Sequence, residues 1–482
     1  MIREYETVIG LEVHVELNTK MKIFCGCSTE FGAEPNTHIC PVCTGMPGAL
    51  PVLNKKVVEY ALAAGEALHC RVNRRCRFDR KNYFYPDNPQ NYQISQLYLP
   101  ICQDGWLEIE TGEEKKKIRI HEMHMEEDAG KLIHDEWEDC TLVDYNRSGV
   151  PLLEIVSEPD MSGKEEVLAY LDKLRTTLKY LGISDCRLQE GSMRADVNLS
   201  VRERGSKSLG TRTEMKNLNS FKAIARAIDG ERERQIELLE MGRAVEQETR
   251  RWDDNKESSR AMRSKEDAKD YRYFPDPDLP ELSIDRQWID RIRKSLPEMR
   301  EEKQQRYQEQ YGLSEYDARL LTQSRPLAEL FEETLRWYGD PKKAANWFLG
   351  DVQRLLKENA LEPEQITFSP EYLGELLNML DQGTINQPVA HQVFEQIFLY
   401  NTEPRAYVEA RGLALVQDTG WLKELVIQVR NREAEAFEKW LQGQEKVLGF
   451  LVGQVMNEAR GKADPVQIKK LFLEEKDEDD NH

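Results

Sequence analysis

The first stretch whose residue types could do chemistry is VIGLEVHVEL, residues 8–17. From Leu11 onward, apolar residues alternate with three polar residues, Glu12, His14 and Glu16. Successive side chains of a β-strand face opposite sides, so this pattern predicts a half-buried strand with an acid, an imidazole and an acid in one row. Such a row can bind a hard cation or transfer protons. The alternative is the solvent side of an antiparallel sheet, where charged residues are common.

Further acids lie later in the chain. Glu154 stands among apolar residues in PLLEIVSEPD, and a carboxylate inside a strand core is costly unless it is paired or bound to metal. The alternative to a metal is a buried ion pair, for which Arg147 is a candidate partner. In HMEEDAGK, Glu126 and Glu127 are consecutive acids, so in a strand their side chains would point to opposite faces of the sheet.

Four cysteines could bind a metal. Cys25 and Cys27 form a C-x-C pair, and Cys40 and Cys43 form a C-x2-C pair after twelve intervening residues. The segment 25–43 holds little apolar material, so a zinc ion would supply stabilisation that packing cannot. Since all four ligands would be thiolates, we expect this zinc to be structural. The alternatives are four reduced thiols or a redox-active CxxC.

Basic residues crowd into the segment from Arg71 to Lys81, and aromatic residues follow directly, from Tyr83 to Tyr92. Cations beside aromatic rings suit the neutralisation of phosphate together with the stacking of a base or an adenine. Long loops rich in Pro, Asn and Asp are often functional sites. The alternative is a solvated basic face beside a packed aromatic loop.

The elements that must position these residues belong to a chain of 482 residues. A single core stops growing near about 250–300 residues, so we expect two or three domains. No apolar run reaches the roughly 18–20 residues of a membrane helix, and the N-terminus lacks a signal-peptide apolar region. Nine cysteines in such a chain indicate a reducing compartment, so we expect a cytoplasmic protein without membrane contact.

The formal net charge of −20 disfavours non-specific binding to nucleic acid, so any contact with RNA must come from local basic patches. From about Leu296 the sequence predicts helices only, and a last helical group begins after Glu403. Lys469 and Lys470 in this last group suit an RNA-binding appendage, although a plain helical bundle explains them equally well. We expect the acidic end, EEKDEDDNH, to be a frayed tail.

Several long motifs resemble one known family. They are VIGLEVHVEL, FDRKNYFYPDNPQNYQISQ, HMEEDAGK, PLLEIVSEPD, EMKNLNSF, YRYFPDPDLP and, near the C-terminus, VLGFLVGQVMNEARGKADP. Together they resemble the B subunit of the glutamyl/aspartyl-tRNA amidotransferase over essentially the whole chain. The resemblance implies an α+β fold in three parts. These are a cradle domain with a mixed or antiparallel sheet at 1–294, which includes the zinc loop at 25–43, an all-helical domain at 295–406, and a small helical, YqeY-like tRNA-binding domain with the acidic tail at 407–482.

The resemblance also implies an activity. Such a subunit uses ATP to phosphorylate the side-chain carboxylate of Glu-tRNA(Gln) or Asp-tRNA(Asn). Ammonia, released from glutamine by an amidase partner, then displaces the phosphate to give Gln-tRNA or Asn-tRNA. The implied assembly is a heterotrimer with the amidase (A) subunit and a small C subunit, and the implied cofactor near the acid/His strand is magnesium. The four-cysteine motif occurs in only some members, and it is complete here.

Matched residue by residue, the resemblance assigns roles to a small set of side chains. Magnesium is expected at Glu12, His14, Glu127 and Glu154. The expected catalytic residues are His14, Lys81, Glu127, Asp196 and Glu214. ATP is expected at Arg80, Lys81, Tyr83 and Lys216. The chain has no G-x-x-x-x-G-K-[ST] loop, so metal-bound carboxylates, Lys81 and nearby arginines would have to neutralise the phosphates.

Two other classes of protein fit part of the sequence. A non-catalytic RNA-binding adaptor would combine a zinc module with a helical appendage, but it gains nothing from costly carboxylates in the N-terminal half. An independent ATP-dependent carboxylate–amine ligase would need its own source of ammonia. We find no amidase-like Ser/Ser/Lys arrangement in a Gly/Ser-rich segment, so we expect the ammonia to come from a partner.

Overall fold

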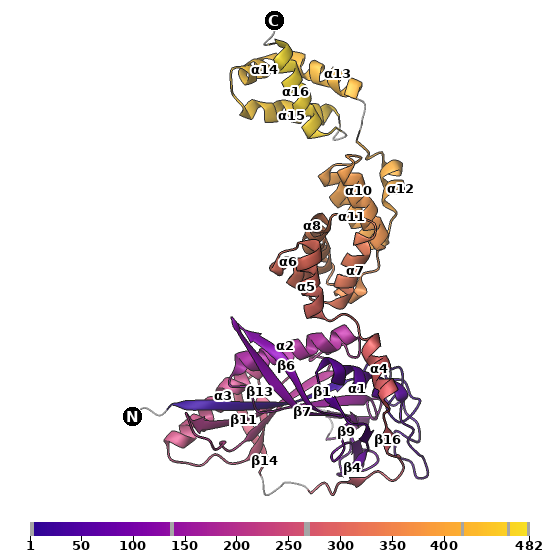
Figure 1. Ribbon diagram of the computed structural model, residues 1–482, viewed down its shortest axis with the longest axis vertical. Helices are drawn as coiled ribbons and strands as arrows, with labels where there is room; N and C mark the ends of the chain where they lie inside the picture. Colours follow the sequence, from indigo (N-terminus) through magenta and orange to yellow (C-terminus); the bar gives the residue numbers. More distant parts are fainter. Residues whose placement is uncertain (1–3, 135–138, 265–269, 416–418, 460–462, 480–482) are drawn as a thin grey trace. The chain divides into compact units, whose positions relative to one another are not determined.

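The computed structural model describes residues 4–134, 139–264, 270–415, 419–459 and 463–479. The chain divides into two compact units, Met1–Met299 and Arg300–His482. All strands in the described residues belong to the first unit, and the second unit is helical (Figure 1). The predicted α+β class, with a mixed sheet followed by helices, is confirmed.

A nine-stranded sheet organises the first unit, and β1 lies near its middle. The strands, from one edge to the other, are β14 (Ser258–Ser264), β13 (Glu248–Asp253), β12 (Thr213–Lys216), β11 (Met193–Glu203), β1 (Tyr5–Glu16), β10 (Pro151–Ser157), β7 (Glu114–Glu127), β6 (Cys102–Thr111) and β2 (Arg71–Val72). Only β12 and β13 pair in parallel; the other neighbours are antiparallel. The central strand is therefore the one that the alternating pattern predicted.

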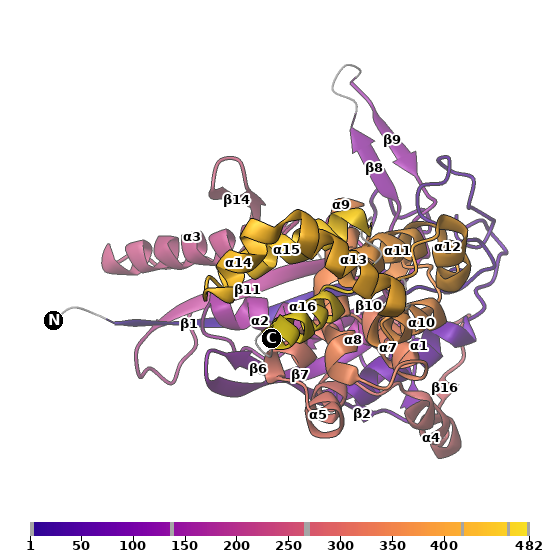
Figure 2. The same cartoon turned by 90° about the horizontal axis from the view of Figure 1, so that it is seen from above.

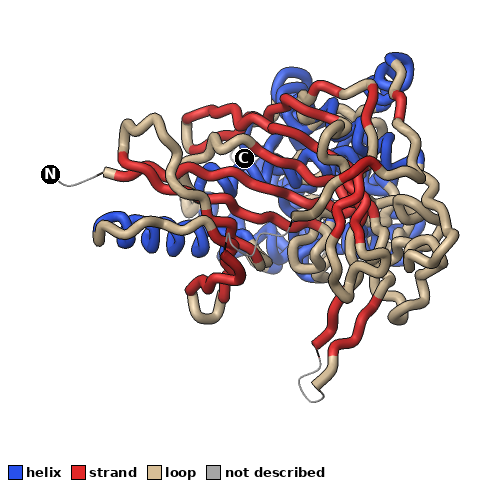
Figure 3. Tube along the Cα trace, turned by 90° about the horizontal axis from the view of Figure 1, so that it is seen from below, coloured by secondary structure: helices blue, strands red, loops and turns tan. Residues whose placement is uncertain are grey.

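The two faces of this sheet differ in character. Leu11, Val13 and Val15 of β1 are at most 1% exposed and belong to the core of the unit. The helices α1 (Lys55–Ala67), α2 (Lys164–Leu181) and α3 (Phe221–Glu240) pack on this apolar face. Figure 3 looks from the side away from α1 and α2, and there the strands lie in front. The polar residues of β1 face this open side.

Local signals explain how α1 reaches the sheet. The helix begins after Asn54, whose side-chain oxygen accepts the Lys56 N–H at 2.9 Å, as the capping pattern predicts. Gly65 lies on its buried side, and a Cβ at this position would come within 2.5 Å of Cys102 Sγ on β6. The absence of a side chain thus allows α1 to lie close behind β6 and β7.

Small sheets flank the large one. Strands β15 (Phe274–Pro275), β4 (Asp79–Asn82) and β5 (Tyr92–Ser95) form one of them, in that order. Strands β3 (Arg75–Cys76) and β16 (Leu282–Ser283) form another, ahead of α4 (Arg286–Ser295). The hairpin of β8 (Lys131–His134) and β9 (Thr141–Asp144) extends away from the rest of the unit (Figure 2).

The second unit contains two separate hydrophobic cores. The first core, which includes Tyr307, Phe331, Phe394 and Val408, is built by α5 to α12, and the second is built by α13 to α16. The bounds are α5 (Arg300–Tyr311), α6 (Glu315–Leu321), α7 (Arg325–Leu335), α8 (Pro341–Trp347), the π-helix η2 (Phe348–Val352), α9 (Gln353–Glu358), the 3-10 helix η3 (Pro363–Gln365), α10 (Pro370–Asp381), α11 (Gln387–Tyr400), α12 (Pro404–Arg411), α13 (Thr419–Arg432), α14 (Ala434–Leu441), α15 (Lys446–Glu458) and α16 (Pro465–Asp479).

Two details of the second unit bear on the sequence-based expectations. α16 continues to Asp479, so the expectation of a frayed end was wrong for residues 474–479, and residues 480–482 lie outside the described part. Glu475 in this helix is buried and pairs with Arg430. Within the described residues of the chain, no helix combines the length and the apolar character needed to cross a bilayer.

We expect Gly65→Ala to lower the melting temperature of the chain. The added methyl group would overlap Cys102 Sγ, and overpacking of a core costs about 1–3 kcal/mol, more than the gain of about 1 kcal/mol in helix propensity. Gly230→Ala in α3 is the control, because its Cβ would meet only the ring of Trp252 at 3.4 Å. The measurement is thermal unfolding followed by circular dichroism. A higher melting temperature for both variants would contradict the close approach of α1 to β6.

Candidate active site

Four neighbouring strands bring acids and imidazoles into one row on the open face of the large sheet. His14 on β1 lies opposite Glu154 on β10 and opposite Arg194 on β11. Glu154 in turn lies opposite His124 on β7. Residues directly opposite each other in antiparallel strands point to the same face, so the four side chains stand side by side.

Two carboxylates and two imidazoles form the first cluster of this face. His14 Nε2 lies 3.3 Å from Glu154 Oε2 and 3.6 Å from Glu126 Oε1. His124 Nε2 lies 3.0 Å from the same oxygen of Glu154 and 3.7 Å from Glu126 Oε2. One possible ligand atom from each of His14, Glu126 and Glu154 lies within 4.8 Å of the others. Carboxylate oxygens and an imidazole nitrogen at this spacing suit a divalent cation.

Glu154 is charged because of its imidazole neighbours. Burial raises the pKa of this carboxyl, but His124 and His14 outweigh burial and hold the pKa well below its usual range. Burial lowers the pKa of each imidazole, but Glu154, helped by Glu126 and at His124 also by Glu122, more than compensates, so both imidazole pKa values are raised. The buried acid is thus paired with histidines and not with Arg147, whose Nε lies 3.5 Å from Asp128 Oδ2.

Glu12, Asp196 and Glu214 form the second cluster, with one oxygen of each within 4.8 Å of the others. Glu12 lies opposite Asp196 across β1 and β11, and β12 brings Glu214 to them. The ammonium of Lys216 contacts both Asp196 and Glu214. Burial, followed by the charge of Glu154, raises the pKa of Glu12, so the two clusters are close enough to influence each other.

Glu127 lies apart from the other residues predicted to hold magnesium. It follows Glu126 on β7, so its side chain points to the opposite face of the sheet. Gln90 Nε2 and the Ile94 N–H donate to Glu127 Oε1, at 2.5 and 2.9 Å. Burial raises the pKa of Glu127 to about 8, even though the Ile94 N–H lowers it. This carboxyl can therefore exchange a proton near neutral pH.

Glu126 and His124 belong to the first cluster, but the sequence-based set of ligands did not include them. The sequence did contain a signal for them. His124 and Glu126 alternate along β7 with Met123 and Met125, which face the core, so both polar side chains point to the open face. The pattern does not reveal which residue of β7 lies opposite Glu154, because that depends on the register between β7 and β10.

The small sheet β15–β4–β5 lies beside the first cluster. Ser95 Oγ on β5 donates to Glu126 Oε2 at 3.2 Å. Lys81 on β4 lies opposite Gln93 on β5, and its ammonium is 5.1 Å from the centre of the Tyr271 ring. Over the described chain, no carboxylate oxygen lies within 4.0 Å of the Lys81 ammonium. Lys81 thus carries a positive charge that is not compensated by a direct ion pair.

Four of the five arginines of the basic segment instead form ion pairs with acids. Arg80 donates to Asp276 and Asp278, each at 2.8 Å, and its guanidinium lies 4.2 Å from the centre of the Tyr92 ring. Three others form ion pairs: Arg71 with Asp104, Arg75 with Glu281 and Arg77 with Asp79. The ring of Tyr83 meets that of Tyr271 edge to face at 6.4 Å, and burial raises the pKa of Tyr83. Most of this segment therefore holds the loop in place.

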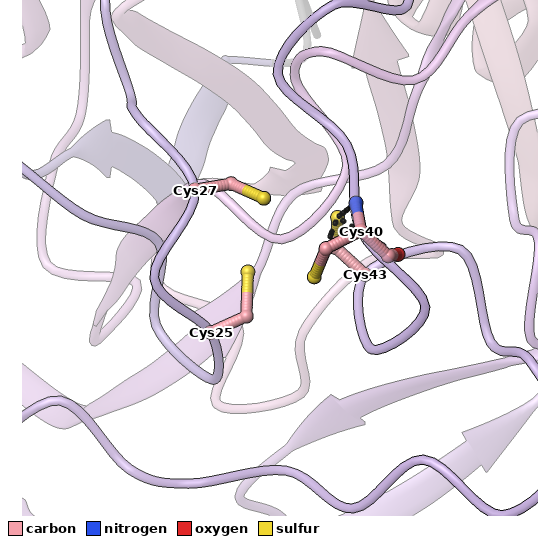
Figure 4. Close-up of side chains that lie close together, drawn as sticks. All are labelled: Cys25, Cys27, Cys40 and Cys43. Carbon is pink, nitrogen blue, oxygen red and sulfur yellow. Dashed lines mark hydrogen bonds between the residues drawn. The ribbon is translucent and has the colours of Figure 1, made fainter.

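The two cysteine pairs converge, as their spacing predicted. The Sγ atoms of Cys25, Cys27, Cys40 and Cys43 lie within 4.8 Å of one another and turn toward a common centre (Figure 4). The sulfurs of Cys40 and Cys43 are 3.9 Å apart, close to the roughly 3.8 Å that tetrahedral zinc requires with Zn–S distances of about 2.3 Å. The Cys40 N–H also donates to Cys43 Sγ at 3.2 Å. This donor set fits a structural zinc ion.

Comparison with known proteins agrees with the geometry. The family model described as the GatB/GatE catalytic domain matches residues 7–290, and the one described as the GatB domain matches residues 329–475. The B subunit of the aspartyl/glutamyl-tRNA(Asn/Gln) amidotransferase of Agathobacter rectalis is 62% identical, over 98% of this chain and 100% of the relative. The proteins of that name from Lachnoclostridium phytofermentans and Caldicellulosiruptor bescii are 58% and 53% identical, each over 98% of this chain and 99% of the relative. The chain belongs to the family of aspartyl/glutamyl-tRNA(Asn/Gln) amidotransferase B subunits.

Proposed function

We propose that this chain phosphorylates the side-chain carboxylate of Glu-tRNA(Gln), Asp-tRNA(Asn) or both, with ATP as the phosphoryl donor. A carboxylate oxygen of the substrate attacks the γ-phosphorus, and ADP leaves. Ammonia then attacks the activated carbonyl carbon, phosphate leaves, and the nitrogen gives up a proton. The names of the relatives and the two acid clusters on one open face support this assignment.

The observation that carries the proposal is the pair of clusters, side by side on one sheet. Phosphoryl transfer depends chiefly on positioning and on neutralising phosphate charge. Magnesium, when bound, supplies that charge to the phosphate oxygens. We assign its ligands to His14, Glu126 and Glu154 in the first cluster and to Glu12, with Asp196 and Glu214, in the second.

Two lysines would assist at the phosphates. Lys81 stands on the small sheet beside the first cluster without a direct ion pair in the described chain, so its ammonium is free to meet the transferring group. Lys216 contacts Asp196 and Glu214 and would hold these acids in place until ATP binds. Tyr83 and the ammonium of Lys81 both contact the ring of Tyr271, and we assign the stacking of the adenine to these aromatic rings, with Arg80 on the same strand as Lys81.

We assign proton transfer to Glu127. Its raised pKa of about 8 lets it accept a proton near neutral pH, and an ammonium ion must give up a proton before its nitrogen can attack the activated carbonyl carbon. Its carboxyl lines a cavity together with Cys43 and Gln90, on the side of the sheet away from the first cluster. Ammonia arriving from that side would meet Glu127 before it reaches the substrate.

The chain would work with partners in the cytoplasm, where aminoacylated tRNA and ATP are found. The proposed assembly is a heterotrimer with an amidase (A) subunit, which releases ammonia from glutamine, and a small C subunit. The helices α13 to α16 would contact tRNA. Zinc at the four cysteines would be structural, and the ATP-dependent step would need magnesium.

We expect Glu126→Gln to weaken the binding of Mn²⁺, used as a probe for magnesium, by about tenfold or more, because it removes a charged ligand of the first cluster. Glu127→Gln is the matched control next to it on β7. It should leave Mn²⁺ affinity unchanged, since its side chain points to the other face. Electron paramagnetic resonance of free Mn²⁺ measures both affinities. Weaker Mn²⁺ binding by Glu127→Gln together with unchanged binding by Glu126→Gln would instead identify Glu127 as the ligand.

We expect Glu154→Gln to abolish transfer of the labelled γ-phosphate of ATP in the presence of Glu-tRNA(Gln) or Asp-tRNA(Asn), because the two imidazoles lose the carboxylate between them. Glu158→Gln is the control. It also breaks a carboxylate–histidine pair, to His121 at 2.9 Å, but on an exposed part of the same sheet. The assay contains the partner subunits and compares charged with uncharged tRNA. Transfer that is indifferent to aminoacylation would argue against a kinase role.

We expect the double charge reversal Lys469→Glu/Lys470→Glu to weaken tRNA binding and to reduce its salt dependence. Both side chains are exposed on α16, and removing one phosphate contact lowers the slope of log K against log[salt] by about 1. Titration of tRNA at several salt concentrations gives this slope. An unchanged slope would remove α16 from the proposed tRNA surface.

A further inference from the structure

Lys22 is a fully buried lysine next to the cysteine cluster. Its side chain is 0% exposed, and its ammonium donates to the carbonyl oxygen of His38 at 2.8 Å and to that of Tyr145 at 3.3 Å. The same nitrogen lies 3.6 Å from Cys43 Sγ. These three acceptors match the three N–H donors of an ammonium group.

A buried ammonium needs an anion close by. Isolation of a charge from water costs several kcal/mol unless an opposite charge compensates for it. Across the described residues, no carboxylate oxygen lies within 4.0 Å of the Lys22 nitrogen. The carbonyl oxygens of His38 and Tyr145 are dipoles, so the sulfur of Cys43 is the one contact that can carry a full negative charge.

The cysteine cluster, with zinc bound, would carry an excess of negative charge that a nearby cation can balance. Four thiolates around one divalent zinc ion carry a net charge of −2, and such sites require hydrogen bonds or positive charges around the sulfurs. Cys43 is the most buried of the four cysteines, and the Cys40 N–H already donates to its sulfur at 3.2 Å. Lys22 adds a positive charge to the same sulfur.

The contacts of Lys22 also link the cluster to the chain that leads into β10. Tyr145 is followed by Asn146, whose side-chain oxygen accepts the His38 N–H at 2.8 Å. Ser148 Oγ donates to the Cys43 carbonyl oxygen at 3.2 Å. The segment 145–149 leads directly to β10, the strand that carries Glu154.

We propose that Lys22 is the counter-charge and positioning residue of the zinc–tetrathiolate centre, and that through it the bound metal orders the segment 145–149 ahead of β10. The inference rests on zinc occupancy of the four cysteines. It assigns Lys22 a role in holding the metal and no part in the transfer of phosphate.

The test compares Lys22→Met with Lys20→Met in the full-length chain. Methionine keeps an unbranched side chain of similar length and removes the charge, and Lys20 is an exposed lysine two residues away. Zinc content is measured by elemental analysis, and zinc release to an excess of a coloured chelator is followed over time. We expect Lys22→Met to release zinc about tenfold faster or more, and Lys20→Met to match the unaltered chain.

Thermal unfolding with zinc and after chelation separates this role from a purely structural one. If Lys22 acts on the metal site, Lys22→Met lowers the melting temperature more with zinc bound than after chelation. If it only ties the carbonyl oxygens of His38 and Tyr145 together, both forms shift equally, and the proposal is overturned. Release at the unaltered rate would overturn it as well.

A labelling experiment on the unaltered chain covers the case in which Lys22→Met does not fold. An amine-reactive reagent followed by mass spectrometry should leave Lys22 unmodified with zinc bound and modify it after chelation. Equal modification in the two forms contradicts the proposal. If the unaltered chain holds no zinc, the assignment of zinc to the four cysteines is wrong. If the chain holds zinc and Lys22→Met does not change its release, only the role of Lys22 is wrong.

Discussion

The register of β1 between β10 and β11 is the constraint on which the site depends. It sets His14 opposite Glu154 and Glu12 opposite Asp196, so this one strand contributes to both clusters. A slip by one residue would turn these side chains into the core and expose the apolar row of β1. The burial of Val13 and Val15 opposes any such slip. The apolar face therefore fixes the geometry of the polar face.

The open face carries many charges, and most of them are balanced by neighbours. Glu154 lies between two imidazoles, and Lys216 lies between two carboxylates. Such pairs hold the acids in place before any ligand arrives, which limits the reorganisation needed when phosphate binds. An imidazole must lose its proton to ligate a metal, so the proposed binding of a metal at His14 would release a proton.

Local patterns predicted much of this molecule, and long-range pairing explains what they missed. The strand at β1, the convergence of the four cysteine sulfurs and the helical second half depend on patterns of neighbouring residues and were confirmed, whereas zinc at the cysteines stays a prediction. The choice between Glu126 and Glu127 depends on which face of β7 meets β10, which no local pattern contains. The basic segment from Arg71 to Lys81 looked free to bind phosphate, but the acids that pair with Arg75 and Arg80 lie about 200 residues along the chain, at Glu281 and Asp276.

The cost of these acids bears on the alternative of an RNA-binding adaptor. Glu126 and Glu127 are 3% and 6% exposed, and burying a carboxylate is expensive unless other groups compensate for it. The acids of the two clusters come from β1, β7, β10, β11 and β12, so distant parts of the chain converge on one face. Their negative charge would repel the RNA backbone unless cations intervene. A surface that only binds RNA has no use for such a concentration of acids, whereas a site that holds divalent cations against phosphates depends on it.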